Sequence, residues 1–444
     1  MTNTREIALD CVMEIMEKKQ YSHYVLKQVL DKYGFLEKRD RSFIKCVTEG
    51  TIERAIELDY VIDQFSKVKV KKMKPLIRSL MRMSVYQLLY MDKTLDAAVC
   101  NEAVKLASKR GFQSLKGFVN GVLRTIARNK ENIVYPDVAT NPILYLSVRY
   151  SMPEWIVSMW TEQLGFEETE HVLQGLIEKR PLMIRMDEGM KDAEKTSLLE
   201  TFMKEQIDLE QLPTLPYAYL VENPDRVDNL PGFAEGKIMI QDAGSMEIIE
   251  FADIQKDWYI VDVCGAPGGK ALHAASKLQG SGYVSVRDLS ERKMELILEN
   301  IRRSGYQNIA AKVWDATVLD EGEIGKADLV IADLPCSGLG VVGRKADIKY
   351  RLAKSDVTEI AALQRQILET VKQYVKTGGF LLFSTCTLTK EENEDNVYWF
   401  ENQSAFKLVK EKTLYPAPNG LTDGFYMALF QKEEYKWKKQ ISNH

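Results

Sequence analysis

The stretch YIVDVCGAPGGK, residues 259–270, decides the fold of this sequence. Its first half is a short apolar run rich in β-branched residues, which predicts a buried strand. A glycine-rich turn follows, and GKALHAASKL (269–278) predicts a helix directly behind it. A strand that runs through small residues into a helix N-terminus leaves backbone N–H groups free, and this is a typical place for a nucleotide-like ligand.

Two common nucleotide-binding loops fit this stretch poorly. The run from Gly265 to Lys270 is one residue short of a P-loop, and Ala271 stands where that loop needs Ser or Thr. The glycines also lack the G-x-G-x-x-G spacing of dinucleotide sites. A glycine loop alone is weak support for a cofactor site. The residues at the ends of the neighbouring strands are therefore needed as further evidence for a bound cofactor.

Strands and helices alternate from about residue 236 onward. The predicted strands after the loop are GYVSVRD, IAAKVWD, ADLVIADLP and GGFLLFST, with helical patterns such as ERKMELILENIRRSG among them. This alternation predicts a doubly wound, mostly parallel sheet. The segment DGFYMALFQK (423–432) predicts a final, antiparallel edge strand.

Three aspartates end successive predicted strands. Asp288 comes about twenty residues after the loop, where a carboxylate accepts both ribose hydroxyls; Asp315 and Asp333 end the next two strands. Each aspartate alone reads as a turn or helix N-cap residue. Together they line the crevice of the sheet and favour an adenosyl ligand without phosphates, because acids repel a pyrophosphate but tolerate the sulfonium of S-adenosylmethionine.

Two cysteines follow the predicted strands ADLVIADLP and GGFLLFST, the fourth and fifth of the sheet when YIVDVCG is counted as the first. We expect these two strands to be neighbours. Cys336 and Cys386 are therefore expected to face one pocket. A thiolate that attacks C6 of cytosine makes C5 able to take a methyl group from a sulfonium. Asp333 is well placed to supply the acidic group that this chemistry needs at the N3/N4 edge of the cytosine. A lone free cysteine is more often part of the core, and these residues alone leave open which thiol attacks.

The residues around these cysteines add two expectations. Thr389 and Glu392 predict a capping box, whose helix N-terminus would favour the Cys386 thiolate. Cys264 is given only a backbone role, and packing roles are assigned to Cys11, Cys46 and Cys100. Without a CxxC pair and with four histidines, the chain predicts no metal site and a reduced, cytosolic protein.

The 444 residues are too many for one ordinary domain. Residues 1–130 predict an all-helical domain with 25 Lys and Arg against 15 Asp and Glu, whereas the rest of the chain has a net charge of −14. The segment KVKVKKMK (67–74) suits a phosphate backbone, although a solvated helix face is an equally good interpretation. Residues 131–235 predict a small α/β insert, and residues 236–434 the larger α/β domain.

Several motifs resemble a known family. CGAPGGK, DLPCSGLG and STCTLTKEEN are similar to motifs of RNA cytosine-5 methyltransferases, and GRKADIKYR, LQRQIL and DGFYMALF match in order. RDRSFIKCVTEG and GFVNGVLR resemble NusB-like helical RNA-binding domains. This combination resembles the bacterial Sun/Fmu/RsmB family. The resemblance implies an α/β Rossmann-like S-adenosylmethionine methyltransferase domain, an all-α NusB-like N-terminal domain and a small RRM-like α/β insert between them.

The resemblance also implies roles for single residues. Cys386 would be the nucleophile, Cys336 would assist product release, and Asp333 would orient or protonate the base. The residues that would bind S-adenosyl-L-methionine are Cys264, Gly265, Ala266, Pro267, Gly268, Gly269, Lys270, Asp288, Arg292, Asp315 and Asp333. The partner would be naked or early-assembly small-subunit ribosomal RNA, with cytosine 967 the family expectation, and the protein a cytoplasmic monomer without metal or membrane.

The sequence departs from the family pattern at a few positions. Gly265 stands where Ala is usual, Ala271 where Thr is frequent and Ala346 where Pro is frequent, and Arg287 is an unusual charged neighbour of Asp288. None of these changes removes a catalytic atom. Two alternatives remain: a non-catalytic RNA-binding or antitermination-type factor, and the same chemistry on transfer RNA or DNA.

Overall fold

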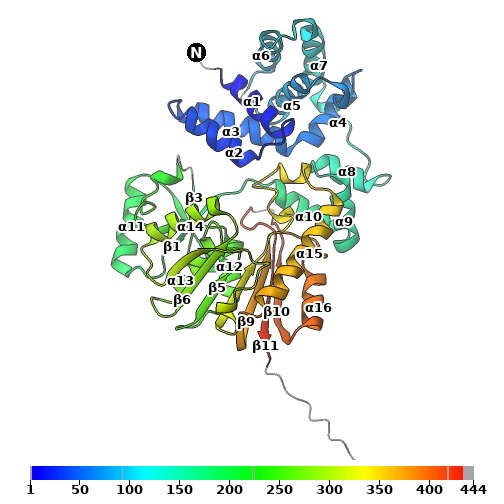
Figure 1. Ribbon diagram of the computed structural model, residues 1–444. Coiled ribbons are helices and arrows are strands. Elements are labelled where there is room, and N and C mark those ends of the chain that lie inside the picture. The colour runs from blue at the N-terminus through cyan, green and yellow to red at the C-terminus, as the bar shows by residue number, and fades with distance from the viewer. Residues whose placement is uncertain (1–2, 93, 223, 225, 418–419, 434–444) are drawn as a thin grey trace, which may run out of the picture. The chain divides into compact units, whose positions relative to one another are not determined.

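The structure is a computed structural model that describes residues 3–92, 94–222, 224, 226–417 and 420–433 (Figure 1). The chain forms two compact units. One consists of the chain up to Glu178 together with Val342–Leu352, and the other of Lys179–Val341 together with the chain from Ala353 onward. In the described part of the chain, no helix is long and apolar enough to cross a membrane.

The first unit is helical, as the apolar periodicity predicts. Its helices are α1 (Thr4–Met16), α2 (Ser22–Lys32), α3 (Lys38–Glu53), α4 (Ala55–Phe65), α5 (Pro75–Tyr90), α6 (Asp96–Lys109), α7 (Lys116–Arg128), α8 (Pro142–Arg149), α9 (Glu154–Leu164) and α10 (Phe166–Ile177). Helix α5 contacts α1, α3, α4, α6 and α7. It is therefore the central helix of this core, and Pro75 lies in its first turn as expected.

The segment Val342–Leu352 belongs to the helical unit, although the chain on either side of it does not. The buried carboxylate of Asp347 accepts hydrogen bonds from the backbone N–H of Ser22, at 3.3 Å, and from the Ser22 hydroxyl. The buried ammonium of Lys349 donates to the carbonyl oxygen of Glu53 at 2.8 Å. The GRKADIKYR motif is thus anchored on the N-terminal helices.

The second unit begins with a small antiparallel sheet of order β2-β3-β1-β4. Its elements are β1 (Leu182–Met186), α11 (Asp192–Lys204), β2 (Leu209–Leu212), β3 (Leu215–Val221) and β4 (Ile238–Ile240). Strand β4 lies beyond residue 235, and helices α8 to α10 lie beyond residue 130. The division into three domains at these two residues, understood as independently folding pieces, stays a prediction.

The large sheet has the order β10-β11-β9-β8-β5-β6-β7, in which β5 to β9 are parallel and β11 is antiparallel to both of its neighbours, β9 and β10. Its strands are β5 (Tyr259–Asp262), β6 (Tyr283–Asp288), β7 (Ile309–Val313), β8 (Ala327–Asp333), β9 (Val375–Thr385), β10 (Phe406–Leu414) and β11 (Phe425–Lys432). The predicted strand–helix alternation and mostly parallel sheet are confirmed.

Helices cover both faces of this sheet, as can be followed in Figure 1. One face packs on α12 (Ala243–Phe251), α13 (Gly269–Lys277) and α14 (Glu291–Ser304), and the other on α15 (Lys354–Val371) and α16 (Glu394–Gln403). Successive residues of β5, Ile260 and Val261, are fully buried against opposite faces. Burial on both faces explains why the central strands read as continuous apolar runs.

The segment 423–432 forms the antiparallel strand β11, but the prediction that this strand is the edge was wrong. Strand β10 pairs outside β11 and is the edge. The sequence of β10, FKLVKEKTL, carries exposed lysines and one glutamate, so it lacks the apolar run by which the other strands were recognised. Charged residues suit an edge strand because they discourage pairing with another chain.

We predict that Asp347→Ala destabilises the protein. Removing the carboxylate leaves the buried N–H and hydroxyl of Ser22 without an acceptor, which costs about 1–3 kcal/mol in the free energy of unfolding. Urea denaturation followed by circular dichroism measures this loss. The exposed neighbour Lys345 supplies the control, since Lys345→Ala should change stability by less than about 0.5 kcal/mol. Equal effects of the two substitutions would contradict the anchoring role of Asp347.

Candidate active site

The glycine loop connects β5 to α13 and brings the backbone close to β6. Gly268, the N-cap of α13, has a φ of +106°, a left-handed conformation that other residues rarely adopt. Gly265 donates its N–H to the carbonyl oxygen of Arg287 at 2.8 Å. A Cβ on Gly265 would lie 2.3 Å from Cγ2 of Val286 and 2.9 Å from Oδ2 of Asp262, so alanine does not fit there unless both side chains move.

A cleft of about 180 Å³ opens beside this loop. The residues that line it are Ile240, Gln241, Asp242, Ser245, Asp262, Gly265, Ala266, Pro267, Gly269, Lys270 and Asp333. Two polar atoms of this wall, Oδ2 of Asp262 and Nε2 of Gln241, are buried without a hydrogen-bond partner among the described residues. Since buried polar groups are normally paired, these atoms point to a ligand that completes the site.

Asp262 is a site residue that the sequence analysis missed. It ends β5, its side chain is fully buried, and burial together with the nearby charge of Asp333 raises its pKa to about 7. The signal was available, because an aspartate between the valines of a buried strand is unusual. A carboxyl group with this pKa is present in both its neutral and its charged form near neutral pH.

The remaining predicted cofactor residues occupy different places. Asp288 accepts a hydrogen bond from the N–H of Ala266 at 3.4 Å and so supports the glycine loop. Asp315 accepts from both the N–H and the hydroxyl of Thr317, at 2.9 and 2.7 Å. Arg292 is exposed on α14. Neither Asp315 nor Arg292 is among the residues that line the cleft.

Two departures from the family pattern have structural explanations. Arg287 is buried, and its guanidinium lies 3.1 Å from Asp320 and 2.7 Å from Glu323. Its charge is therefore neutralised away from the cofactor loop. Ala271 is fully buried in the apolar core between α13 and the sheet, where a hydroxyl would need a partner.

Cys336 and Cys386 meet beyond the carboxyl ends of β8 and β9. Their sulfur atoms lie 3.2 Å apart, and the N–H of Cys386 donates to the sulfur of Cys336 at 3.3 Å. The hydrogen bond to Cys386, followed by burial, raises the pKa of Cys336 well above its usual range. The structure thus brings together the two thiols that the sequence placed after neighbouring strands, and it holds Cys336 in the protonated form.

A charged pair lies at the wall of the cleft next to these thiols. The ammonium of Lys270 lies 2.8 Å from Oδ2 of Asp333, whose other oxygen accepts from the hydroxyl of Ser384 at 2.7 Å. Burial lowers the pKa of Lys270, but the charges of Asp333 and Cys386 outweigh this effect and raise it. Lys270 is therefore a permanent positive charge that interacts with Cys386.

The other cysteines follow the packing predictions in part. Cys11 and Cys100 are buried in the helical unit. The packing assignment of Cys46 was wrong, because its side chain is exposed, with the sulfur 3.7 Å from the Tyr86 hydroxyl. Cys264 is half-buried and packs against the core on one face of the sheet; burial raises the pKa of its thiol.

The predicted capping box at Thr389 and Glu392 was wrong. Helix α16 begins at Glu394, with Asn393 as its N-cap residue and no side-chain cap. The chain makes a separate turn first, and the Glu392 carboxylate accepts from the N–H of Ser337 at 2.8 Å instead. Glu392 is thus tied to the residue that follows Cys336 and not to a helix end.

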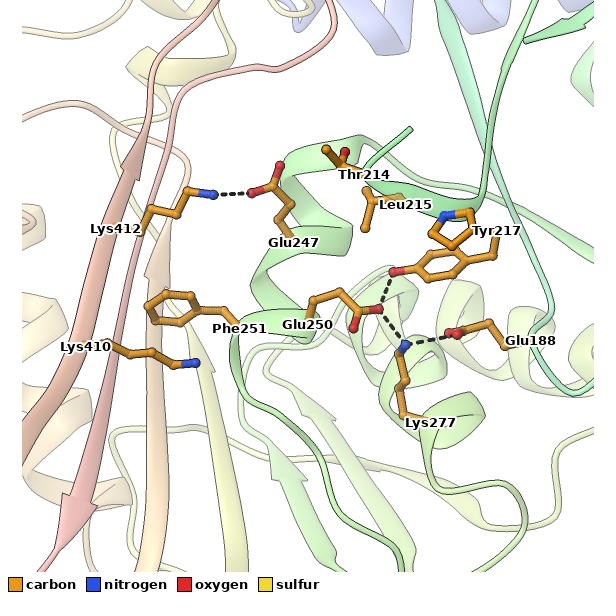
Figure 2. Close-up of a pocket in the computed structure, with 11 residues that line it drawn as sticks. Glu188, Thr214, Leu215, Tyr217, Glu247, Glu250, Phe251, Lys277, Lys410 and Lys412 are labelled. Carbon is orange, nitrogen blue, oxygen red and sulfur yellow. Dashed lines mark hydrogen bonds and ion pairs between the residues drawn. The ribbon is translucent and has the colours of Figure 1, made fainter. Parts of the chain in front are cut away.

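A larger cavity of about 620 Å³ lies elsewhere in the second unit and shares no lining residue with the cleft (Figure 2). Beside it, ligand atoms of Glu188, Glu250 and His273 lie within 4.8 Å of one another, close enough for a metal ion. The Lys277 ammonium already lies 2.9 Å from Glu188 and 2.6 Å from Glu250, as Figure 2 shows. An ion would have to displace this ammonium, so the cluster is explained by its own ion pairs.

Comparisons with known proteins identify relatives of this chain. A model of the "16S rRNA methyltransferase RsmB/F" family matches residues 250–431, and a model of the NusB family matches residues 2–128. The probable ribosomal RNA small subunit methyltransferase B of Bacillus subtilis is 35% identical over 90% of this chain and 88% of its own length.

Two solved structures share the fold. The crystal structure of PH0851 covers 98% of this chain and 99% of its own, with a TM-score of 0.79 and 24% identity. NSun6 from Pyrococcus horikoshii, solved with SFG, covers 62% of this chain and 97% of its own, with a TM-score of 0.56 and 22% identity.

Fold and cleft together define an S-adenosylmethionine-dependent methyltransferase joined to a NusB-type helical domain. The chain belongs to the RsmB/F family of 16S rRNA methyltransferases.

We predict that Gly265→Ala weakens binding of S-adenosylmethionine, because the new methyl group forces the loop away from Val286. The cost of such overpacking is about 1–3 kcal/mol. The double variant with Val286→Ala should bind better than Gly265→Ala alone, since it removes the closer of the two clashes and leaves the one with Asp262. Isothermal titration calorimetry of the two single variants and the double variant tests this, and additive effects would contradict the steric explanation.

Proposed function

We propose that this chain transfers a methyl group to C5 of a cytosine in 16S rRNA, for which cytosine 967 is the family expectation. Cys386 acts as the nucleophile, Cys336 assists release, and Asp333 orients or protonates the base. The observation that carries the proposal is the contact of the two sulfur atoms, 3.2 Å apart, next to the charged wall of the cleft. We also propose that the enzyme works in the cytoplasm as a monomer, on naked or early-assembly RNA.

The cleft fits the cofactor of this family. Unpartnered Oδ2 of Asp262 and Nε2 of Gln241 offer an acceptor and a donor to a polar ligand. Asp333 adds a second carboxylate, so the wall suits a sulfonium. S-adenosylmethionine, when bound, supplies an electrophilic methyl group. The residues that we propose to hold it are Cys264, Gly265, Ala266, Pro267, Gly268, Gly269, Lys270, Asp288, Arg292, Asp315 and Asp333, with Asp262 and Gln241 added.

The charges around the two thiols favour different roles for them. Lys270, whose ammonium interacts with Cys386, favours a thiolate at that position. The hydrogen bond to Cys386 is the largest cause of the raised pKa of Cys336, and the charge of Glu392 adds to it. The pair therefore holds its shared proton on Cys336 and leaves Cys386 as the nucleophile. This electrostatic difference supports Cys386, and not Cys336, as the attacking thiol, a question that the residues alone left open.

The proposed chemistry begins when the Cys386 thiolate forms a bond to C6 of cytosine and the electron pair of the C5–C6 double bond moves to C5. The Asp333 carboxylate, held by Lys270 and Ser384, accepts a hydrogen bond from the N4 amino group of the base and so orients the ring. C5 is then nucleophilic and could accept the methyl group that bound S-adenosylmethionine would supply, with S-adenosylhomocysteine as the leaving group. The target base has to be flipped out or single-stranded, because stacking shields C6.

Release requires that C5 lose its proton and the C6–S bond break. Once Cys386 is bonded to carbon, it no longer accepts the hydrogen bond that raises the pKa of Cys336. Cys336 then gives its own proton to solvent and takes the C5 proton, while the electron pair of the C5–H bond restores the double bond. The thiolate of Cys386 leaves, and the enzyme returns to its starting state.

We expect opposite outcomes for the two cysteine variants, tested with radiolabelled cofactor and naked small-subunit RNA. Cys386→Ala should abolish transfer, and Cys336→Ala should accumulate a denaturant-resistant protein–RNA adduct. Mapping the labelled nucleotide identifies the target base. The exposed thiol of Cys46 gives the control, because Cys46→Ala should retain activity and form no adduct.

Three results would refute parts of this proposal. An active Cys386→Ala enzyme would remove its nucleophile, and an adduct in that variant but not in Cys336→Ala would reverse the two roles. Failure of the wild type to bind S-adenosylmethionine would favour a non-catalytic RNA-binding factor. Label on transfer RNA or DNA, with none on ribosomal RNA, would change the substrate.

The helical unit supports RNA binding through the segment 67–74. This segment forms a short 3₁₀ turn at Val70–Lys72 that is held by buried Val70 and Met73. Its five lysines are all exposed: Lys67, Lys69, Lys71, Lys72 and Lys74. Five positive charges on a short anchored turn suit a phosphate backbone, so we propose that this turn contacts the ribosomal RNA.

Replacing Lys69, Lys71 and Lys72 with alanine should weaken RNA binding and flatten its salt dependence. Each lost phosphate contact reduces the slope of log K against log salt by about 0.7–0.9, so three contacts give a change of about 2. Fluorescence anisotropy at several salt concentrations measures the slope. A charge-matched control replaces the lysines of β10, which are Lys407, Lys410 and Lys412. An equal change in slope for both triples would contradict a specific role of the turn.

A further inference from the structure

Glu392 is a fully buried carboxylate that lies between the loops of the two thiols. It accepts hydrogen bonds from the N–H and the hydroxyl of Ser337, at 2.8 and 2.6 Å. It also accepts from the Thr389 hydroxyl at 2.6 Å and from Nε2 of Gln364 at 3.4 Å. Burial raises the pKa of Glu392, while these donors act against that rise. A buried acid with four donors around it is an organised site and not a chance contact.

The partners of Glu392 are the residues next to the two thiols. Ser337 follows Cys336, and its hydroxyl lies 2.7 Å from the hydroxyl of Thr387, which follows Cys386. Gln364 on α15 donates to the carbonyl oxygen of Pro335, at 2.9 Å, on the other side of Cys336. Hydrogen bonds centred on Glu392 therefore join the backbone segments of both cysteines.

The neighbouring Asn393 extends this network along the Cys386 loop. Its side-chain oxygen accepts from the Thr385 hydroxyl at 2.6 Å, and its amide donates to the carbonyl oxygen of Thr387 at 3.0 Å. These bonds flank Cys386 on both sides. The loop that carries Cys336 lies outside regular secondary structure up to Ser337. Backbone hydrogen bonds from Leu334 to Ser384 and from Gly340 to Cys386 fix its two ends, and the side-chain bonds of Glu392 hold the part between them.

We propose that Glu392 is a positioning residue that keeps the Cys336 loop in register with the Cys386 loop, so that both thiols reach the same base. Its catalytic consequence rests on the proposed function, but its effect on the distance between the sulfur atoms does not. Release needs Cys336 within reach of the adduct on Cys386, and a displacement of about 1 Å costs about 10²-fold in rate. Glu392 touches neither substrate nor cofactor in this role, and it acts through Ser337 and Thr387.

The first test measures the thiol pair without any RNA. Phenylarsine oxide condenses with two neighbouring thiols, forming two As–S bonds and releasing water, so its affinity reports how well the pair is aligned. The specific binding is the part of the wild-type signal that is lost in Cys336→Ala and in Cys386→Ala. We expect Glu392→Ala to lower this affinity at least about tenfold, because the loops lose their common acceptor.

Three further variants make this test specific. Glu392→Gln keeps an acceptor for the Ser337 N–H and should bind the arsenical more tightly than Glu392→Ala. Thr387→Val removes the bridging hydroxyl but leaves Glu392 in place, so it should weaken binding even if Glu392→Ala does not fold. The matched control is Glu391→Ala, because the Glu391 carboxylate bonds to Thr358 outside this network and the change should have no effect.

The second test uses turnover. Glu392→Ala should lower kcat about 10²-fold while KM for RNA and the affinity for S-adenosylmethionine stay within about threefold, and the denaturant-resistant adduct should accumulate as in Cys336→Ala. A merely structural defect would lower adduct and product together.

The two tests separate the two proposals. Loss of arsenical affinity in Glu392→Ala, without any cysteine-dependent RNA adduct, would retain the positioning role and refute the chemistry. Three results would overturn the positioning role. The first is wild-type arsenical affinity in folded Glu392→Ala or Thr387→Val. The second is a Glu392→Gln variant that binds the arsenical no better than Glu392→Ala, and the third is the absence of any binding that depends on both thiols.

Discussion

Asp333 pairs with Ser384 in the parallel ladder of β8 and β9, and the whole site depends on this register. Parallel strands end at the same edge of a sheet, so the loops that leave them start side by side. Cys336 lies three residues after Asp333, and Cys386 two residues after Ser384. The sulfur atoms meet because of this match. A slip of one residue would turn the side chains of a strand to the opposite face and separate the pair.

Charge then makes two otherwise similar thiols unequal. Lys270 is paired with Asp333 and interacts with Cys386, whereas Cys336 lies near the buried carboxylate of Glu392. The side chains of Lys270 and Glu392 are largely buried, and charges act more strongly where the effective dielectric constant is low. The same sheet edge thus provides a cleft with acidic residues in its wall and two thiols in contact with each other.

Much of the fold was predictable because local patterns and burial agree. The strands β5, β6 and β8 and the glycine loop follow from apolar runs and from the turn residues between them. Strand β10 was missed because its lysines and its exposed face remove the apolar run. Asp262 was missed because its place in an apolar strand, although unusual for an acid, was not followed up in the sequence analysis, and only the structure shows that its side chain lines a cleft.

The sequence by itself determined the alternation of strands and helices, the position of each thiol at a strand end, and the class of ligand that an acidic crevice accepts. These properties depend on periodicity, turn chemistry and charge, which are local. Only the tertiary structure decided that Glu392 bonds to Ser337 and not to its own helix, and that Asp347 and Lys349 join the N-terminal helices. Such contacts join residues 55 to 325 positions apart, and burial selects those partners only once the chain has folded.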